Sequence, residues 1–247
     1  RWMHRSFATS FAISNYVSYG QIFQSKAIGE PPEFSIIQEV YGGNVRRTSP
    51  YECQEGQRPG WVLTISKYQE IIPLLKDAER YCLIKHNQAR LVLNYLELDK
   101  QECLSFAIAV SMHNQDHTKA EIDINRMTDA YVAGLFAAEG GVQLRKPGYH
   151  MRLTISQKSS PKTLKALVAY FGFGFSWKKA YEVSCGRGVE FSRRILPHLR
   201  GQKLPQLQLA LQSQLRRRQG GRNAKRIKED TEYAKEAAKE IKRLKRL

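Results

Sequence analysis

Acidic residues are scarce in this sequence, and its first 29 positions contain none. The 247 residues include 40 lysines and arginines but only 23 aspartates and glutamates, so the net charge is +17. A chain this basic commonly binds a polyanion, most often nucleic acid, because each contact with a phosphate releases counterions. The charge therefore favours a nucleic-acid partner, and the alternative is a basic surface that serves solubility alone.

The sequence also lacks the patterns of a membrane protein, a disulfide-rich protein and a zinc-binding protein. Its longest apolar stretch, at 103–112, is well short of the roughly 18 residues that cross a bilayer. None of the four cysteines stands in a C-x-x-C pair, which favours a reducing compartment. We expect a soluble, folded protein with no membrane partner. We also expect His113 and His117 to lie in a solvated loop rather than in a metal site.

The N-terminal composition indicates an organelle. Residues 1–29 combine arginine, serine and aromatic residues without an acid, which resembles the mature edge of an organelle-targeted protein. The chain begins at Arg1 rather than at methionine, so we expect either processing or further residues upstream. A mitochondrion or a chloroplast is the expected location.

Two halves of the chain repeat the same order of elements. Alternating apolar and polar residues predict strands, and apolar residues three or four positions apart predict helices. In the first half the expected order is a strand at 20–27, a helix at 31–43, a strand at 60–66 and two helices within 67–98. In the second half it is a strand at 149–159, a helix at 160–174, a strand at 179–185 and helices at 188–199 and 204–215.

The spacing within the halves also repeats. Lys26 and Gly42 are 16 positions apart, and so are Lys158 and Gly174. A period of about 120–130 residues indicates a duplicated domain rather than a solenoid of short repeats. We therefore expect a first repeat at 1–98, a linker at 99–128, a second repeat at 129–215 and a basic extension at 216–247.

The C-terminal extension carries much of the charge. Residues 216–247 contain thirteen basic and five acidic residues, a net charge of +8, which leaves +9 for the rest of the chain. The extension opens with Arg216, Arg217 and Arg218, which we expect to contact nucleic acid. Beyond a Gly-broken segment, the pattern from 227 to 247 predicts a solvated basic helix with charge pairs between neighbouring turns.

One helix stands out in the second half. The stretch DAYVAGLFAAEGG, residues 129–141, predicts a helix that ends at two glycines. Its small residues Ala133, Gly134 and Ala137 would allow a second helix to approach closely. Glu139 is the last residue before the glycines, and a basic hairpin around 146–148 follows.

This stretch resembles the signature helix of the LAGLIDADG homing endonucleases. Residues 132–140 follow the nine-residue pattern of that helix, with Glu139 at its acidic position. The order of helix, hairpin, helix, hairpin and helices after it is similar to that family too. So is the Lys-x-x-Gln pattern that precedes a leucine-rich helix at both Lys85 and Lys203. The resemblance covers about residues 20–215.

The resemblance implies an α+β fold. Two αββαββα repeats would be related by a pseudo-twofold axis within one chain, as a monomeric pseudo-dimer, and each would lay a saddle-shaped antiparallel sheet on DNA. The basic helix would follow at the C-terminus. In the family, the acid at each helix end binds Mg²⁺ and the pair of sites cuts both strands.

The resemblance also implies roles for individual residues. Glu139 would be a catalytic acid and metal ligand, and Lys85 and Lys203 would lie near the scissile phosphate. Ala133, Gly134 and Ala137 would pack against the other signature helix. The side chains implied in contacting nucleic acid from the hairpins are Arg46, Arg47, Arg145, Lys146, His150, Arg152, Lys178 and Lys179.

The first half departs from the family pattern. Glu139 precedes Lys158 by 19 positions, and the position 19 before Lys26 is Phe7, which is not an acid. The first signature helix is therefore expected either upstream of Arg1 or replaced. Three readings stay open. One is a Mg²⁺-dependent endonuclease that cuts duplex DNA. The second is a nucleic-acid-binding relative without cleavage, such as an RNA-binding intron maturase or a component of an organellar ribosome. The third is a basic protein with a chance signature.

Overall fold

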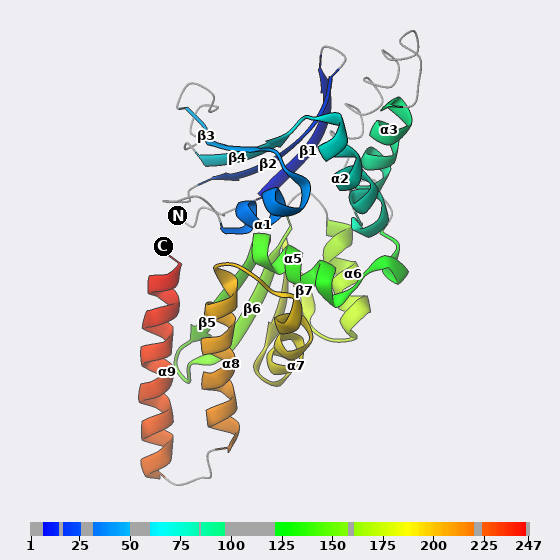
Figure 1. The fold of residues 1–247 in the computed structure, drawn as a ribbon. Helices are drawn as coiled ribbons and strands as arrows, with labels where there is room; N and C mark the ends of the chain where they lie inside the picture. Colours follow the sequence, from blue (N-terminus) through cyan, green and yellow to red (C-terminus); the bar gives the residue numbers. More distant parts are fainter. Residues whose placement is uncertain are drawn as a thin grey trace. The chain divides into compact units, whose positions relative to one another are not determined.

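A computed structural model describes residues 7–14, 17–25, 32–49, 60–83, 85–96, 122–157, 161–219 and 224–245. The chain divides into two compact units, Arg1–Arg126 and Met127–Leu247 (Figure 1). Among the described residues, no helix is long and apolar enough to cross a bilayer.

The first unit is a four-stranded antiparallel sheet with helices. Its elements are β1 (Phe7–Ser14), β2 (Val17–Ser25), α1 (Pro32–Tyr41), β3 (Asn44–Arg47), β4 (Gly60–Ile65), α2 (Tyr68–Tyr81), α3 (His86–Leu96) and the short 3₁₀ helix η2 (Ile124–Arg126). The strand order is β1-β2-β4-β3, and neighbouring strands are antiparallel. The predicted pair of helices within 67–98 is confirmed.

The second unit repeats this topology. Its elements are α5 (Asp129–Glu139), β5 (Gly140–Arg145), β6 (His150–Ser156), α6 (Pro161–Phe171), β7 (Phe175–Trp177), β8 (Ala180–Ser184), α7 (Cys185–Ile195), η3 (Leu196–His198), α8 (Lys203–Gln219) and α9 (Ala224–Leu244). The strand order is β5-β6-β8-β7, which is the order of the first sheet. The α+β class with two antiparallel sheets is confirmed, and this unit has the αββαββα order.

The first helix after the first hairpin shows why the two units fold alike. Both α1 and α6 begin at a proline, Pro32 and Pro161, whose fixed φ suits the first helical position. Both are followed by a glycine with a left-handed backbone, Gly42 at φ 73° and Gly172 at φ 68°. Glycine adopts this conformation without strain, so each helix ends sharply and the chain turns into the next strand.

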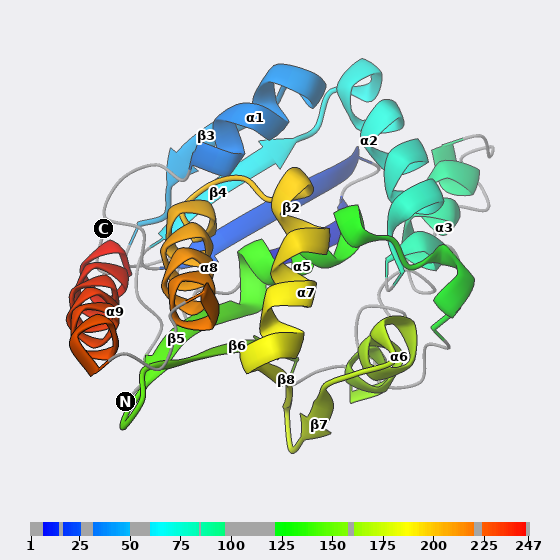
Figure 2. The same ribbon diagram turned by 90° about the horizontal axis from the view of Figure 1, so that it is seen from below.

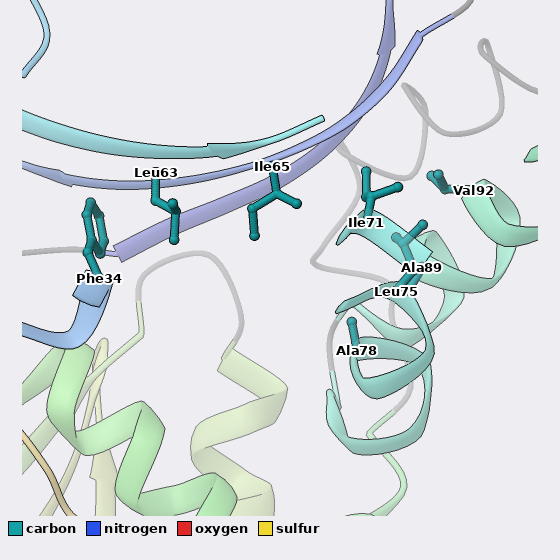
Figure 3. Packing of buried hydrophobic residues seen from close by; sticks show 8 residues of the cluster. All are labelled: Phe34, Leu63, Ile65, Ile71, Leu75, Ala78, Ala89 and Val92. Carbon is teal, nitrogen blue, oxygen red and sulfur yellow. The ribbon is translucent and has the colours of Figure 1, made fainter. Parts of the chain in front are cut away.

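The core of the first unit lies between its sheet and its helices. Leu63 and Ile65 are two residues apart on β4, so both side chains project from the same side of the strand (Figure 3). They belong to one buried cluster with Phe34 of α1 and with Ile71 and Leu75 of α2, all at most 1% exposed. Full burial of each such side chain contributes about 2–3 kcal/mol. This cluster therefore holds α1 and α2 against the sheet.

The core of the second unit is aromatic. Phe136 of α5 and Phe191 of α7 meet edge to face, with ring centroids 5.7 Å apart. Phe171 lies 5.0 Å from Phe191 and 6.2 Å from Tyr181 of β8. The hydroxyl of Tyr181 donates a hydrogen bond to the carbonyl oxygen of Phe173, 3.0 Å away. Rings from α5, α6, α7 and the sheet thus form one cluster.

The C-terminal helix is present as predicted, but one of its faces is buried. α9 runs antiparallel to α8 (Figure 1), and it also contacts β5. Ala234, Ala237 and Ile241 are at most 5% exposed. They recur three and four residues apart, which forms a narrow apolar stripe on one side of an otherwise charged helix. The expectation of a helix solvated on all sides is therefore wrong.

Candidate nucleic-acid interface

Strand alternation gives the second sheet one buried side and one accessible side. Along β6, Met151 and Leu153 are buried, whereas His150 is exposed and Arg152 is half-buried. α7 and α8 lie over one side of the sheet (Figure 2). We call the other side the open face. By strand register and burial, it carries Gln143 and Arg145 of β5, His150, Arg152 and Thr154 of β6, Glu182 and Ser184 of β8, and Phe175 and Trp177 of β7.

Predicted cationic residues gather at one end of this face. Arg145 pairs with His150 across the β5–β6 hairpin, and both side chains are exposed, as is Lys146 in the connecting turn. Arg217 reaches the same turn from α8. A Cβ placed on Gly148 would lie 2.7 Å from Nε2 of His150 and 3.3 Å from Nη2 of Arg217. The hairpin therefore assembles a cationic cluster from two elements.

A second cationic pair lies at the other end. Lys178 and Lys179 form the two-residue turn between β7 and β8, and both are exposed. Because Ser156 at the far end of β6 pairs with Ala180, this turn lies at the opposite end of β6 from His150. A strand of seven residues spans about 20 Å. The open face thus has positive charge at both ends.

Arg152, at the middle of the face, is already paired. Its guanidinium donates to a carboxylate oxygen of Glu182 on β8, and the two side chains are 24% and 14% exposed. The ion pair neutralises Arg152 locally. Its structural role is to join β6 to β8, so less of its charge is offered to a phosphate than the sequence suggested.

The remaining predicted arginines lie elsewhere. Arg216 forms an ion pair with Asp230 at 3.5 Å, and its guanidinium lies 4.4 Å from the ring centroid of Tyr233. Arg216 therefore joins α8 to α9. The side chain of Arg218 lies outside the described residues. Arg46 and Arg47 are neighbours on β3 of the first unit, so they point to opposite sides of its sheet, and both are exposed.

The structure brings Glu139 and Lys203 together through the backbone. Glu139 is the last residue of α5, and β5 begins directly at Gly140. A Cβ at position 140 would lie 2.1 Å from the carbonyl oxygen of Phe136, so only glycine fits this junction. Nζ of Lys203, the first residue of α8, donates a hydrogen bond to the carbonyl oxygen of Gly140. The two residues expected to act in catalysis thus lie at one junction.

The groups at this junction do not build a Mg²⁺ site by themselves. Mg²⁺ prefers several oxygen ligands in octahedral geometry. The junction offers one carboxylate side chain, that of Glu139, and the carbonyl oxygen of Gly140. That carbonyl oxygen already accepts a hydrogen bond from the ammonium group of Lys203. Among the described residues, no group of three or more His, Cys, Asp and Glu side chains is placed to hold a metal ion. The donor set does not fit the ion, and we derive no chemistry through it.

Lys85 occupies the corresponding place in the first unit. It precedes α3, the last helix of that repeat, as Lys203 begins α8. Burial lowers the pKa of Lys85 to about 8, and the nearby Cys82 partly opposes this shift. A half-buried amine with this pKa exchanges its proton near neutral pH. That property suits proton transfer, and it is also the ordinary result of placing an ammonium group in a protein interior.

The small residues of α5 differ in exposure. Ala133 is 1% exposed. Gly134 is exposed, and a Cβ built there would meet nothing within 4 Å. Ala137 is half-buried. Close packing of a second helix at Ala133, Gly134 and Ala137 stays a prediction.

An anchor at the start of α5 was not expected from the sequence. Arg194 of α7 forms an ion pair with Asp129 at 2.7 Å, and the hydroxyl of Tyr170 donates to the same carboxylate at 3.0 Å. Burial opposes ionisation of Asp129, but the hydrogen bonds from Arg194 and Tyr170 outweigh it and lower its pKa. The partners are 41 and 65 positions away in the chain, so no local pattern signals them.

Two exposed aromatic residues on β7 were also not singled out. Phe175 and Trp177 lie directly before the Lys178–Lys179 turn, on a strand of three residues. In the sequence, the two aromatic residues are separated by the polar Ser176. This alternation is the signal that could have identified a strand with both rings on one side.

Comparisons with known proteins give only distant similarity. Neither protein-family models nor curated proteins match the chain. Two similar solved structures are both of the homing endonuclease I-CvuI. One is in complex with the I-CreI target in the presence of 2 mM Mg with the DNA not cleaved, and the other is in complex with its target (Sro1.3) in 2 mM Ca. The TM-score is 0.39 in both cases, at 20% and 19% identity, over 47% of this chain and 80% of that chain. This similarity does not establish a family, so a function has to be inferred from the residues of this chain.

Proposed function

We propose that this protein binds nucleic acid through the open face of its second sheet. The observation that carries the proposal is the placement of cationic side chains at both ends of that face. Arg145, Lys146 and Arg217 gather at one hairpin, and Lys178 and Lys179 form the other turn. Exposed lysines and arginines at such separations suit a polymer with regularly repeated negative charge better than a small anion.

The balance of charge on the face supports a polyanion. Glu182 is the acid among the described residues of the open face, and Arg152 neutralises it. The hairpin cations are therefore not offset by acids on the same surface. By contrast, acids alternate with bases on α9, where Lys235, Lys239 and Arg243 each pair with a glutamate three residues earlier. The open face is thus the better candidate for phosphate contacts.

The salt dependence of binding tests the proposal. We would measure the affinity of the full chain for labelled duplex DNA, duplex RNA and single strands by fluorescence anisotropy at several salt concentrations. The test variant replaces Arg145, Lys146, Lys178 and Lys179 with glutamine. Each lost phosphate contact lowers the slope of log K against log salt by about 0.7–0.9. We expect a slope reduced by about 3–4 and a large loss of affinity at low salt.

A matched variant separates this interface from a general effect of net charge. Lys162 and Lys165 lie on α6, and both are exposed. Replacing these two with glutamine removes as many charges as replacing Lys178 and Lys179 alone. We expect the variant with Lys178 and Lys179 replaced to bind more weakly than the parent. We expect the variant with Lys162 and Lys165 replaced to bind almost as the parent does. Equal losses in both would mean that binding depends on net charge and not on the open face.

The finer readings differ in the nucleic acid that is bound. Site-specific cleavage of duplex DNA is the activity implied by the sequence resemblance, and the incomplete donor set at Glu139 is the observation against it. Binding to RNA, as an intron maturase or as a component of an organellar ribosome, needs the basic face but no metal. Preference for one polymer in the anisotropy experiment separates these readings.

A further inference from the structure

Two large aromatic side chains are exposed together on the open face. Phe175 is 50% exposed and Trp177 is 64% exposed, and both belong to β7. Phe175 pairs with Glu182 and Trp177 pairs with Ala180, so both rings are on the side of the sheet that carries the hairpin cations. In the described part of the second unit, the other large apolar side chain exposed to this degree is Ile227 of α9.

The setting of these rings is not that of an apolar docking patch. Their neighbours along the chain are Ser176, Lys178 and Lys179, which are polar or charged. Leaving both rings in water forgoes the stabilisation that burying each would give. A patch that binds an apolar protein partner usually gathers several apolar residues with charged groups at its rim. Here the charges adjoin the rings directly.

Aromatic and cationic groups are coupled at this site. Nζ of Lys178 lies 6.0 Å from the ring centroid of Trp177. A flat ring beside an ammonium group matches a nucleotide, whose base offers a flat face and whose phosphate offers a negative charge. Two residues apart on one strand, the rings are separated by about 6.8 Å. That separation lets two rings contact two bases of an extended strand rather than one.

Base faces are accessible only where bases are unpaired. In a duplex each base is stacked between its neighbours, and a protein reads the edges of the bases in the grooves. Aromatic platforms on a sheet bind single strands, loops and ends, because there the bases can turn outward. Rings on this face are therefore informative about the conformation of the partner as well as its charge.

We propose that Phe175 and Trp177 stack on unpaired nucleobases of a single-stranded segment whose phosphates contact Lys178 and Lys179. This inference rests on the proposed function and specifies it further. The shared chemistry is an unpaired nucleotide, and single-stranded DNA and single-stranded RNA are its two sources. A groove-reading interface for duplex DNA is the alternative that the same experiment decides.

The test measures binding of the full chain to four labelled probes. These are oligo(dT), oligo(U), a duplex of the same length, and an abasic strand that keeps the phosphates but lacks the bases. The variants are Phe175→Ala, Trp177→Ala and Trp177→Phe. Each alanine variant is expected to bind the single strands at least about fivefold more weakly. Trp177→Phe keeps a ring and is expected to recover most of the affinity.

A control variant tests for loss of an aromatic residue in general. Tyr68 on α2 of the first unit is 59% exposed, and Tyr68→Ala is expected to bind all four probes as the parent does. Thermal unfolding of every variant is expected at the parent's midpoint, because the replaced rings are exposed. The difference between oligo(dT) and oligo(U) identifies which source is preferred.

The possible outcomes separate this inference from the proposed function. One outcome is that the parent binds the single strands, replacement of Lys178 and Lys179 with glutamine weakens that binding, and the alanine variants bind as the parent does. Stacking is then excluded while nucleic-acid binding stands. Stacking is also excluded if the abasic strand binds as tightly as oligo(dT), or if the alanine variants lose as much affinity for the duplex as for the single strands. If the parent binds none of the probes, both proposals fall.

Discussion

Arg194 holds the first residue of the helix that ends at Glu139. Nη2 of its guanidinium lies 2.7 Å from a carboxylate oxygen of Asp129. Cζ of the same guanidinium lies 4.7 Å from the ring centroid of Tyr170 and 4.4 Å from that of Phe171. One arginine thereby joins α5, α6 and α7. Asp129 begins α5 and Glu139 ends it, so this contact fixes the start of the helix whose other end forms the junction with β5.

Asp129→Asn tests this anchor. The variant removes the ion pair and keeps the shape, and we expect it to lower the free energy of unfolding by about 1–3 kcal/mol at neutral pH. The folded-state pKa of Asp129 lies below its ordinary value of 3.8. The stabilisation is therefore present above pH 3.8 and is lost as the pH falls through the folded-state pKa. Urea unfolding of both proteins from neutral to acidic pH measures it, and a constant difference at all pH values would contradict the assignment.

Lys85 predicts a pH dependence in the alkaline range. Its folded-state pKa is about 8, below the ordinary 10.5, so the unfolded chain holds this proton more tightly. Stability should therefore rise as the pH increases from about 8 to about 10.5. The raised pKa of the neighbouring Cys82 acts in the other direction, so only the difference from a variant is informative. We expect Lys85→Met to be more stable than the parent at pH 7, with the gap closing at high pH. A gap that is independent of pH would contradict the low pKa.

The buried face of α9 provides a third prediction. Ile241 is 2% exposed, and Ile227 on the same helix is 53% exposed. Ile241→Asp places a charge in an apolar contact and should cost about 3 kcal/mol or more. Ile227→Asp should change stability by about 0.5 kcal/mol at most. Thermal unfolding compares them, and hydrogen exchange should rise in α9 and β5 of the Ile241 variant only. Equal effects of the two changes would mean that α9 is not docked.

Glu139→Gln tests whether the carboxylate serves binding or cleavage. Because the described donors do not fit Mg²⁺, we expect the variant to bind nucleic acid within about twofold of the parent, in EDTA and in Mg²⁺ alike. Supercoiled plasmid incubated with each protein and Mg²⁺ gives the second readout. Nicking by the parent that the variant loses would make Glu139 a metal ligand, and would require a further carboxylate from residues that the structure does not describe.

The docking of α9 changes how the C-terminal extension should be tested. Truncation before residue 216 would remove Asp230 and the buried stripe of α9 along with the charges. A weakened salt dependence in such a truncation would report lost structure as well as lost phosphate contacts. Charge-neutralising substitutions at exposed positions avoid this ambiguity.

Local patterns in the sequence predicted much of the fold. The prolines and glycines around α1 and α6 marked where helices start and stop, and alternation marked β4, β6 and β8. The short strands β3 and β7 escaped notice, because three or four residues carry too little alternation to separate a strand from a turn. The predicted helix at the C-terminus was right, but its buried stripe was hidden by the charges around it.

The candidate site was predicted less completely, since it depends on partners distant in sequence. Spacing placed Glu139 and Lys203 correctly at element ends, but only the fold shows that the Gly140 carbonyl joins them. Arg152 was expected to contact nucleic acid, and only the fold shows that it forms an ion pair with Glu182 on the neighbouring strand. The role of Glu139, the pseudo-twofold arrangement with a monomeric pseudo-dimer, and the organellar location stay predictions. The predictions for His113 and His117, and the spacing that starts from Lys26 and Lys158, fall on positions outside the described residues.

The lysines at the start of α8 and the end of α9 have one more consequence. The ammonium group of Lys203 donates a hydrogen bond to the carbonyl oxygen of Gly140, and that of Lys245 donates one to the carbonyl oxygen of Val142. These carbonyls are two residues apart on β5, the outermost strand on that side of the sheet, and so point the same way. An outer strand with free carbonyls is a template on which another chain can add a strand and start aggregation. Two ammonium groups block that template here, so the residues that fasten the helices also protect a highly charged protein from polymerising through its sheet.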